Sequence, residues 1–312
     1  MGGRRRLSAR FFLDLENNTV LYYSAYSLRI GSEIPLLELP PAQTGGDVDI
    51  RLTEARTLDG TQSIQWRSNP DAEACFSYPK AGQFQVSGGR EVIVTPEPGA
   101  ASALLRLYVQ GMMLAAILHQ RGLFVLHASI VSAGGHCFAF VGSVGAGKST
   151  MASGFHARGY SVVADDNAAL NLKESPPIVL PAFPSLKIYP EVAAALGYNR
   201  SYLRPVHESQ VKHAQPVLDG FSTGPVPLDA IYVLDREAAP EVSRLSTVET
   251  MRELIRHSVP TRWGLEGDGK HLKMCAQLAN VVPVYRVRTF HNLEEIRGVL
   301  DRILKHREGT KQ

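Results

Sequence analysis

Residues 142–149 read Gly-Ser-Val-Gly-Ala-Gly-Lys-Ser, and this stretch indicates the fold. It matches the phosphate-loop pattern G-x-x-x-x-G-K-[ST], follows an apolar strand-like run and opens a predicted helix over residues 148–158. Because glycine has no Cβ, the backbone at Gly142, Gly145 and Gly147 can curl and turn its N–H groups toward phosphate oxygens. The sequence therefore predicts an α/β protein that binds a nucleotide at this loop.

The loop residues have distinct expected roles toward a triphosphate. Lys148 would place a full positive charge near the β and γ phosphates, and Ser149 would offer a hydroxyl ligand to Mg²⁺. Thr150 fits a first-turn helix position better than a second metal ligand. ATP and Mg²⁺ are therefore the expected cofactors. The expected nucleotide-binding residues are Gly142, Ser143, Val144, Gly145, Ala146, Gly147, Lys148, Ser149 and Thr150.

Two adjacent carboxylates follow the predicted helix. Residues 160–164 read as a short buried strand that ends at Asp165 and Asp166. A helical crossover of this length is close to the minimum that joins parallel neighbours, so both acids should lie beside the loop. One could bind Mg²⁺ while the other accepts a proton from an attacking hydroxyl. The alternative is that Asp-Asp-Asn forms a turn or a cap.

The segment before the loop predicts a mixed sheet. Residues 123–131 and 136–142 are apolar strand-like runs separated by Ser-Ala-Gly-Gly, which is typical of a hairpin. The loop-bearing strand would then have an antiparallel neighbour, unlike an ordinary doubly wound sheet. His127 lies on the first run and could reach the same sheet edge; a satisfied core histidine is the alternative.

The N-terminal part of the chain has a different pattern. Residues 19–96 are rich in turn formers and short strand-like runs, and Gly88-Gly89 predicts a hairpin over residues 84–94. Pro96, Pro98 and Gly99 precede a helical pattern over residues 100–120. We therefore expect a small β-rich domain over residues 1–98 and a second domain over residues 99–312.

Composition excludes several classes of partner. The 312 residues carry 33 Lys and Arg against 30 Asp and Glu, so no charge surplus favours nucleic acid or an anionic membrane. The most apolar run, residues 103–118, is interrupted by Arg106 and Gln110 and is too short to span a bilayer. The three cysteines are far apart, without metal-site or disulfide spacing. A reducing cytoplasm is the expected setting.

Three segments together resemble the kinase domain of bacterial HPr kinase/phosphorylase. They are Leu126-His-Ala-Ser, the loop at 142–149 and Val163-Ala-Asp-Asp. The resemblance implies a P-loop kinase core related to phosphoenolpyruvate carboxykinases, consistent with a mixed sheet, and an active site that contains His127, Lys148, Ser149, Asp165 and Asp166. Whether the protein forms a homo-oligomer is left open.

Other segments are similar to HPr-kinase-related proteins that accompany peptide-modification machinery, including kinases of lasso precursor peptides. These segments begin at Tyr26, Pro184, Val226 and Val282. In that branch, the resemblance implies phosphorylation of a precursor-peptide serine. The glycine-containing signature that classical HPr kinases carry after the paired aspartates is missing here, and a proline-rich stretch leads instead to Lys187. Its absence argues against phosphorolysis and against HPr as the substrate.

Four downstream residues are candidates to contact phosphate or to belong to a mobile lid: Lys187, Arg204, His207 and Lys212. Solvated surface charge is the alternative for each. The expected function is transfer of the γ-phosphoryl group of ATP to a serine hydroxyl on a precursor peptide. A kinase of free serine, of a sugar or of HPr is one alternative, and a non-catalytic ATP-binding regulator is another.

Overall fold

The computed structural model describes residues 19–58, 61–67, 73–207, 210–239, 241–265 and 267–309. Its N-terminal part is a seven-stranded sheet with the order β1-β2-β3-β7-β6-β5-β4, in which β3 is parallel to both neighbours and the other pairs are antiparallel. Gly88 and Gly89 both have positive φ in the predicted hairpin between β6 and β7. The strands are β1 (Leu21–Ala25), β2 (Leu28–Ser32), β3 (Val48–Leu52), β4 (Ser63–Arg67), β5 (Glu73–Tyr78), β6 (Gly82–Ser87) and β7 (Glu91–Pro96).

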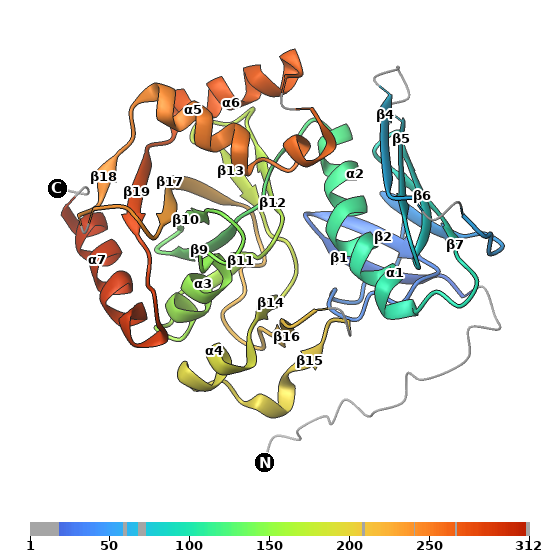
Figure 1. Ribbon diagram of the computed structural model, residues 1–312, viewed down its shortest axis with the longest axis horizontal. Helices are drawn as coiled ribbons and strands as arrows, with labels where there is room; N and C mark the ends of the chain where they lie inside the picture. The colour runs from blue at the N-terminus through green and yellow to red at the C-terminus, as the bar shows by residue number, and fades with distance from the viewer. Residues whose placement is uncertain are drawn as a thin grey trace.

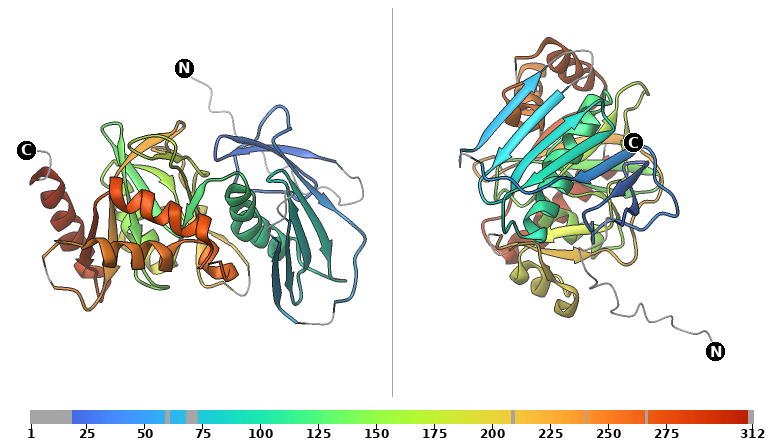
Figure 2. Two further views of the ribbon diagram at one scale, coloured as in Figure 1. Left: turned by 90° about the horizontal axis from the view of Figure 1, so that it is seen from above. Right: turned by 90° about the vertical axis from the view of Figure 1, so that its right-hand side faces the viewer.

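A long helical segment lies between this sheet and the rest of the chain (Figures 1 and 2). It consists of α1 (Ser102–Tyr108), a π-helical turn (Val109–Met113) and α2 (Leu114–Gln120). In the described part of the chain, it is the one helix long and apolar enough to pass a compositional test for crossing a membrane. Half of that window is buried inside the protein, and Tyr108 stacks on Tyr78 of β5 with ring centroids 4.0 Å apart. The segment therefore packs as a core helix.

The C-terminal part contains a nine-stranded mixed sheet with the path β11-β9-β10-β17-β13-β12-β8, and β19 and β18 extend it beyond β17. Strand β17 is long enough to pair with β13 near its start and with β10 and β19 near its end. The strands are β8 (Phe124–Leu126), β9 (Ser129–Ala133), β10 (His136–Val141), β11 (Ser161–Ala164), β12 (Ala168–Asn171), β13 (Ile178–Leu180), β17 (Val226–Asp235), β18 (Ser243–Arg244) and β19 (Val284–Arg288).

The strand order corrects one expectation and confirms another. The hairpin of β9 and β10 is antiparallel, as predicted. Strand β11 is not a direct neighbour of β10, because β9 lies between them and pairs antiparallel with both. Two strands that are both antiparallel to a third run in the same direction, so β10 and β11 still end at the same sheet edge. The mixed α/β architecture is as expected.

The remaining elements cover the large sheet and form a small one. Strands β14 (Ser185–Ile188), β16 (His213–Pro216) and β15 (Arg204–Pro205) make a three-stranded antiparallel sheet in that order. Figure 1 shows α5 and α6 on one side of the large sheet and α7 beside β19. The helices are α3 (Lys148–His156), α4 (Pro190–Ala195), α5 (Thr247–His257), α6 (Gly269–Val281) and α7 (Ile296–Gly309), with short helical turns at Arg200–Tyr202, Pro260–Trp263 and Leu293–Glu295.

Both faces of the loop-bearing strand are buried. Side chains alternate between faces along a strand, and in β10 Phe138 and Phe140 join one core while Cys137, Ala139 and Val141 join the other. The second of these cores continues through the helical segment into the N-terminal sheet. The division of the chain near residue 98 stays a prediction.

Candidate functional site

The loop of residues 142–147 connects β10 to α3 in a conformation that requires glycine at two positions. Gly142 has φ 153° and Gly147 has φ 98°. A Cβ at Gly142 would lie 2.9 Å from the Leu234 carbonyl oxygen, and one at Gly147 would lie 2.6 Å from the Phe290 ring. The left-handed φ values and the tight neighbours both exclude larger residues. At these two glycines the loop backbone therefore lies directly against Leu234 and Phe290, just before the N-terminus of α3.

Lys148 begins α3, and its side chain folds back over the loop. Its Nζ donates to the carbonyl oxygens of Gly142 at 2.9 Å and Ser143 at 3.3 Å. Burial and the nearby charge of Lys212 lower the pKa of Lys148 to about 8. The ammonium group is therefore held in place by carbonyl dipoles and is suited to an anionic ligand.

Asp165 and Asp166 have different environments. Asp165 is buried; its Oδ1 accepts from the Ser129 hydroxyl and its Oδ2 accepts from the Lys187 backbone N–H at 2.7 Å. Both oxygens thus serve contacts within the protein. These contacts join β9, β11 and β14, so Asp165 ties together the strands that surround the loop.

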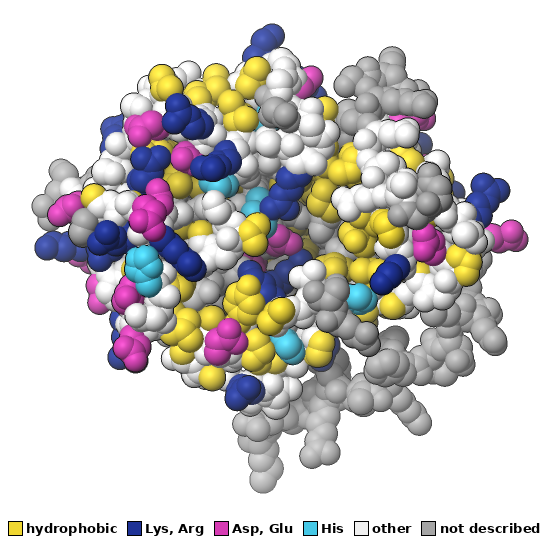
Figure 3. Space-filling view, viewed as in Figure 1, with side chains coloured by type: hydrophobic (Ala, Val, Ile, Leu, Met, Phe, Trp, Pro, Cys, Tyr) yellow, Lys and Arg dark blue, Asp and Glu magenta, His cyan; other side chains and the backbone are white. Residues whose placement is uncertain are grey.

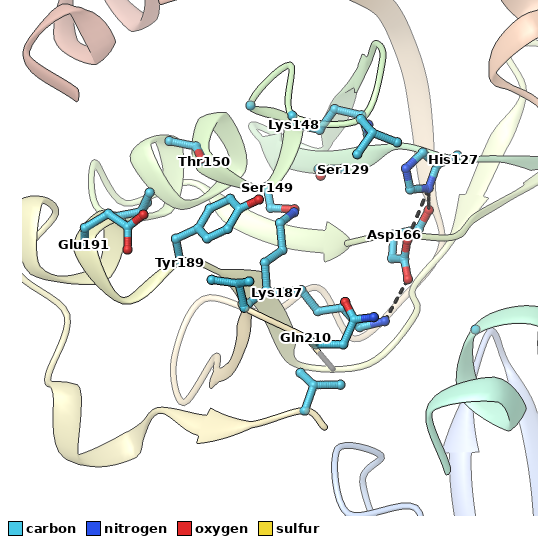
Figure 4. A pocket seen from close by; sticks show the side chains of 18 of the residues that line it. His127, Ser129, Lys148, Ser149, Thr150, Asp166, Lys187, Tyr189, Glu191 and Gln210 are labelled. Carbon is cyan, nitrogen blue, oxygen red and sulfur yellow. Dashed lines mark hydrogen bonds and ion pairs between the residues drawn. The ribbon is translucent and has the colours of Figure 1, made fainter. Parts of the chain in front are cut away.

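Asp166 lies between two basic side chains (Figure 4). Its Oδ2 is 2.7 Å from Lys187 Nζ, and its Oδ1 is 3.2 Å from His127 Nδ1. Burial by itself would raise the pKa of Asp166, but Lys187 and His127 outweigh it and hold the pKa well below the usual range. For Lys187, burial would lower the pKa, and the charge of Asp166 instead raises it. The residue has φ 80°, which turns it sharply away from the line of β11.

His127 lies in the bend between β8 and β9 rather than within the hairpin, which corrects the expected position. Its Nδ1 is 2.9 Å from the Asp166 carbonyl oxygen. Because a carbonyl can only accept, Nδ1 carries the hydrogen, and Nε2 of the neutral ring is left as an acceptor. Burial lowers the pKa of His127, with Asp166 offsetting part of the effect. The ring is therefore neutral at pH 7.

A cavity of about 720 Å³ brings these side chains together. Figure 3 shows a central hollow with Lys and Arg side chains around it and hydrophobic side chains along it. Eight of the predicted residues line the cavity: His127, Val144, Gly145, Gly147, Lys148, Ser149, Thr150 and Asp166. Lys187 and Lys212 line it as well. Gly142, Ser143, Ala146 and Asp165 of the predicted site, and the candidates Arg204 and His207, are not among its described lining residues.

Sequence patterns did not indicate several other lining residues. Ser129 is one that could have been found, because it lies two positions after His127 in the Leu-His-Ala-Ser segment. Arg262 comes from the turn after α5, where no motif marks it. His257 accepts the His127 backbone N–H through its carbonyl at 2.8 Å, so this distant turn is tied to the site. Arg262 thereby adds a cation to the cavity that Lys148 and Lys212 line.

The cavity wall carries oxygen atoms that could coordinate a metal ion bound together with phosphate. No group of three His, Cys, Asp or Glu side chains in the described residues could hold a metal ion alone. Mg²⁺ usually takes only one or two protein oxygens and completes its shell with phosphate and water. The Ser149 hydroxyl and the Asp166 carboxylate both line the cavity and are ligands of this kind. The residues present therefore fit a magnesium nucleotide.

Comparisons with known proteins add little to this geometry. No family model matches the chain, and no curated protein matches it. Among solved structures, the chain is similar to the Hpr(Ser) kinase/phosphatase from Coxiella burnetii, with 13% sequence identity and a TM-score of 0.36. The similarity covers 60% of this chain and 99% of the other. Function is therefore inferred from the cavity and its residues.

Proposed function

We propose that the protein is an ATP- and Mg²⁺-dependent kinase that transfers the γ-phosphoryl group to a serine hydroxyl. The observation that carries the proposal is the shared cavity of the phosphate loop, Lys148, His127 and the Asp166–Lys187 pair. The resemblance of the sequence to lasso precursor-peptide kinases supports a ribosomal precursor peptide as the acceptor. The proposal also places the protein in the cytoplasm and leaves its oligomeric state open.

The cations of the cavity would stabilise negative charge on the phosphates. Loop N–H groups and Lys148 would hold the β and γ phosphates, while Arg262 and Lys212 would neutralise the oxygens of the transferring group. Ser149 and Asp166 would hold Mg²⁺, which supplies further charge neutralisation when bound. Asp165 would act indirectly, by fixing Ser129 and the Lys187 backbone.

Transfer requires an acceptor for the hydroxyl proton. We assign that role to Nε2 of His127, whose neutral ring is held by Asp166. The serine oxygen would form a bond to the γ phosphorus as the bond from that phosphorus to the β,γ-bridging oxygen breaks. ADP would leave with the electron pair, and the proton would pass from His127 to water. A regulator that only binds ATP has no need of such a proton acceptor.

The test is transfer of labelled γ-phosphate from ATP to serine peptides, free serine, a sugar and HPr. Lys148→Ala should abolish transfer while the far-ultraviolet circular dichroism spectrum is unchanged, because the hydrogen bonds of the side chain among the described residues are to loop carbonyls. Lys305→Ala is the matched control on the exposed face of α7. An unchanged rate in Lys148→Ala would refute the assignment. Tight ATP binding without transfer to any acceptor would favour the regulator.

A further inference from the structure

The cavity has two chemically different ends on opposite sides of the phosphate loop. Strand β10 lies between β9 and β17 in the sheet, so residues that follow β17 and β19 lie to one side of the loop. Arg236 and residues 290–293 line the cavity there. On the other side, the lining comes from α1 and the π-helical turn, which is hydrogen-bonded to the turn that follows β11. His127 and Asp166 belong to this second side.

The α1 wall is apolar and carries no charge. It consists of Leu104, Leu107, Tyr108, Gly111 and Met112, all partly exposed. The charged residue of the same helix, Arg106, pairs with Glu38 at 3.4 Å and is not one of the wall residues. The wall itself offers no charged partner for the ammonium and carboxylate groups of a zwitterion such as free serine, whereas an apolar side chain can pack against it without leaving a charge unpaired. A sugar would leave most of its hydroxyls unpaired there.

The wall is attached directly to the turn that carries Asp166. Asn167 follows Asp166, and its Nδ2 donates to the Gly111 carbonyl oxygen at 2.7 Å. Tyr26 of the N-terminal part donates its hydroxyl to the Asn167 carbonyl oxygen at 3.3 Å. The accepting carbonyl of Gly111 lies in the π-helical turn, a feature that is frequent at functional sites. These bonds set the distance between the apolar wall and Asp166.

We propose that the α1 wall binds an apolar side chain next to the serine that accepts the phosphoryl group. The acceptor is then a peptide with a leucine-like residue beside its serine. The inference rests on the proposed kinase function and extends it to the class of acceptor. It also assigns a role to the helical segment that joins the two parts of the chain: it forms the acceptor side of the cavity.

Gly111→Leu tests the proposal by filling the part of the cavity beside the α1 wall. A Cβ at Gly111 meets nothing within 4 Å, so a side chain can begin there in open space, and because Gly111 lines the cavity a leucine should take space from it. Gly298→Leu is the matched control, since this exposed helical glycine in α7 is also free of neighbours and lies outside the cavity lining. Leu107→Asn removes apolar surface from the wall, and Leu37→Asn, at a leucine 51% exposed elsewhere, controls for it.

The assay compares two amidated peptides that differ only in the residue after serine. This residue is leucine in one peptide and asparagine in the other. The wild type and both controls should prefer the leucine peptide about tenfold in kcat/KM, the effect expected for burying one such side chain. Leu107→Asn and Gly111→Leu should lose most of that preference, with the Kd for MgATP within about twofold of wild type.

Four results would overturn the proposal. One is an equal preference for the two peptides in the wild type, and another is a preference that both wall variants retain. The third is a weakened MgATP affinity in both variants, which would show that the wall holds the nucleotide base instead. Transfer to neither peptide, with MgATP still bound, would refute the peptide acceptor alone. Failure to bind MgATP would refute the proposed kinase function itself.

Discussion

Replacement of Lys187 by methionine isolates the ion pair on which the candidate site is built. The Nζ atom lies 2.7 Å from Asp166 Oδ2, and the two side chains are 20% and 29% exposed. At an effective dielectric constant near 20, the gross attraction at this distance is about 6 kcal/mol. Breaking a fully buried pair costs roughly 3–5 kcal/mol, since a charge stays behind. Partial exposure and the remaining contact with His127 reduce the expected loss of unfolding free energy to about 2 kcal/mol.

The loss should depend on pH in a defined direction. The pKa of Asp166 is held well below its usual range, so the pair stabilises the fold above the unfolded pKa of about 4. That contribution disappears as pH falls through the lowered folded pKa. In Lys187→Met the folded pKa rises, because burial remains and the main countercharge is gone. The difference from wild type should therefore be full at pH 7 and shrink as pH falls below about 4, toward the lowered folded pKa of Asp166.

Urea unfolding of the full chain at pH 7 and at a series of pH values below about 4 measures this difference. Lys173→Met, at an exposed lysine, should change the unfolding free energy by less than about 0.5 kcal/mol. In a double-mutant cycle, Asp166→Asn should remove most of the penalty of Lys187→Met, with a coupling energy above about 1 kcal/mol. A Lys187→Met protein as stable as wild type at pH 7, with no coupling to Asp166, would show that the pair contributes nothing to the fold.

Three further predictions concern the loop and its support. The affinity for ATP, measured by calorimetry, should fall above pH 8 because Lys148, with its pKa of about 8, loses its proton. In Lys148→Arg the affinity should stay constant from pH 7 to 9. The same pH dependence of ATP affinity in the wild type and the variant would contradict this prediction. Gly147→Ala should lower stability by about 2 kcal/mol, since a left-handed φ and an aromatic ring oppose the methyl group. Gly145→Ala, with open space around its Cβ, should cost less in the same thermal unfolding assay, and equal losses would be inconsistent. Asp165→Ala should destabilise by about 2 kcal/mol because buried donors from Ser129 and the β14 backbone lose their acceptor, and an unchanged Tm would argue against that support role.

Local sequence determined the elements whose physical requirements are local. The glycines of the loop at residues 142–147 are needed for φ values and close contacts that arise within a few residues and from the strands beside the loop. The hairpins at Gly88-Gly89 and before β10 follow from turn chemistry and alternating burial, which a short window of sequence contains. The adjacent aspartates could be placed near the loop because strands that run in the same direction share an edge.

Only the tertiary structure decided which of the two aspartates supports the fold and which one faces the cavity. Asp165 and Asp166 are adjacent and chemically identical, yet one is tied to Ser129 and the β14 backbone while the other faces the cavity between His127 and Lys187. That difference follows from the positive φ of Asp166 and from strands that come from distant parts of the chain.

The α1 wall of the cavity could not be recognised from the sequence either. Its helix read as ordinary core, and Arg262 lay outside any motif, since neither has a local pattern that distinguishes a cavity wall from a packed surface. The sequence determined where the glycine-rich loop begins and that a helix follows it. The fold decided which side chains surround it, because a cavity is defined by contacts between segments that are far apart along the chain.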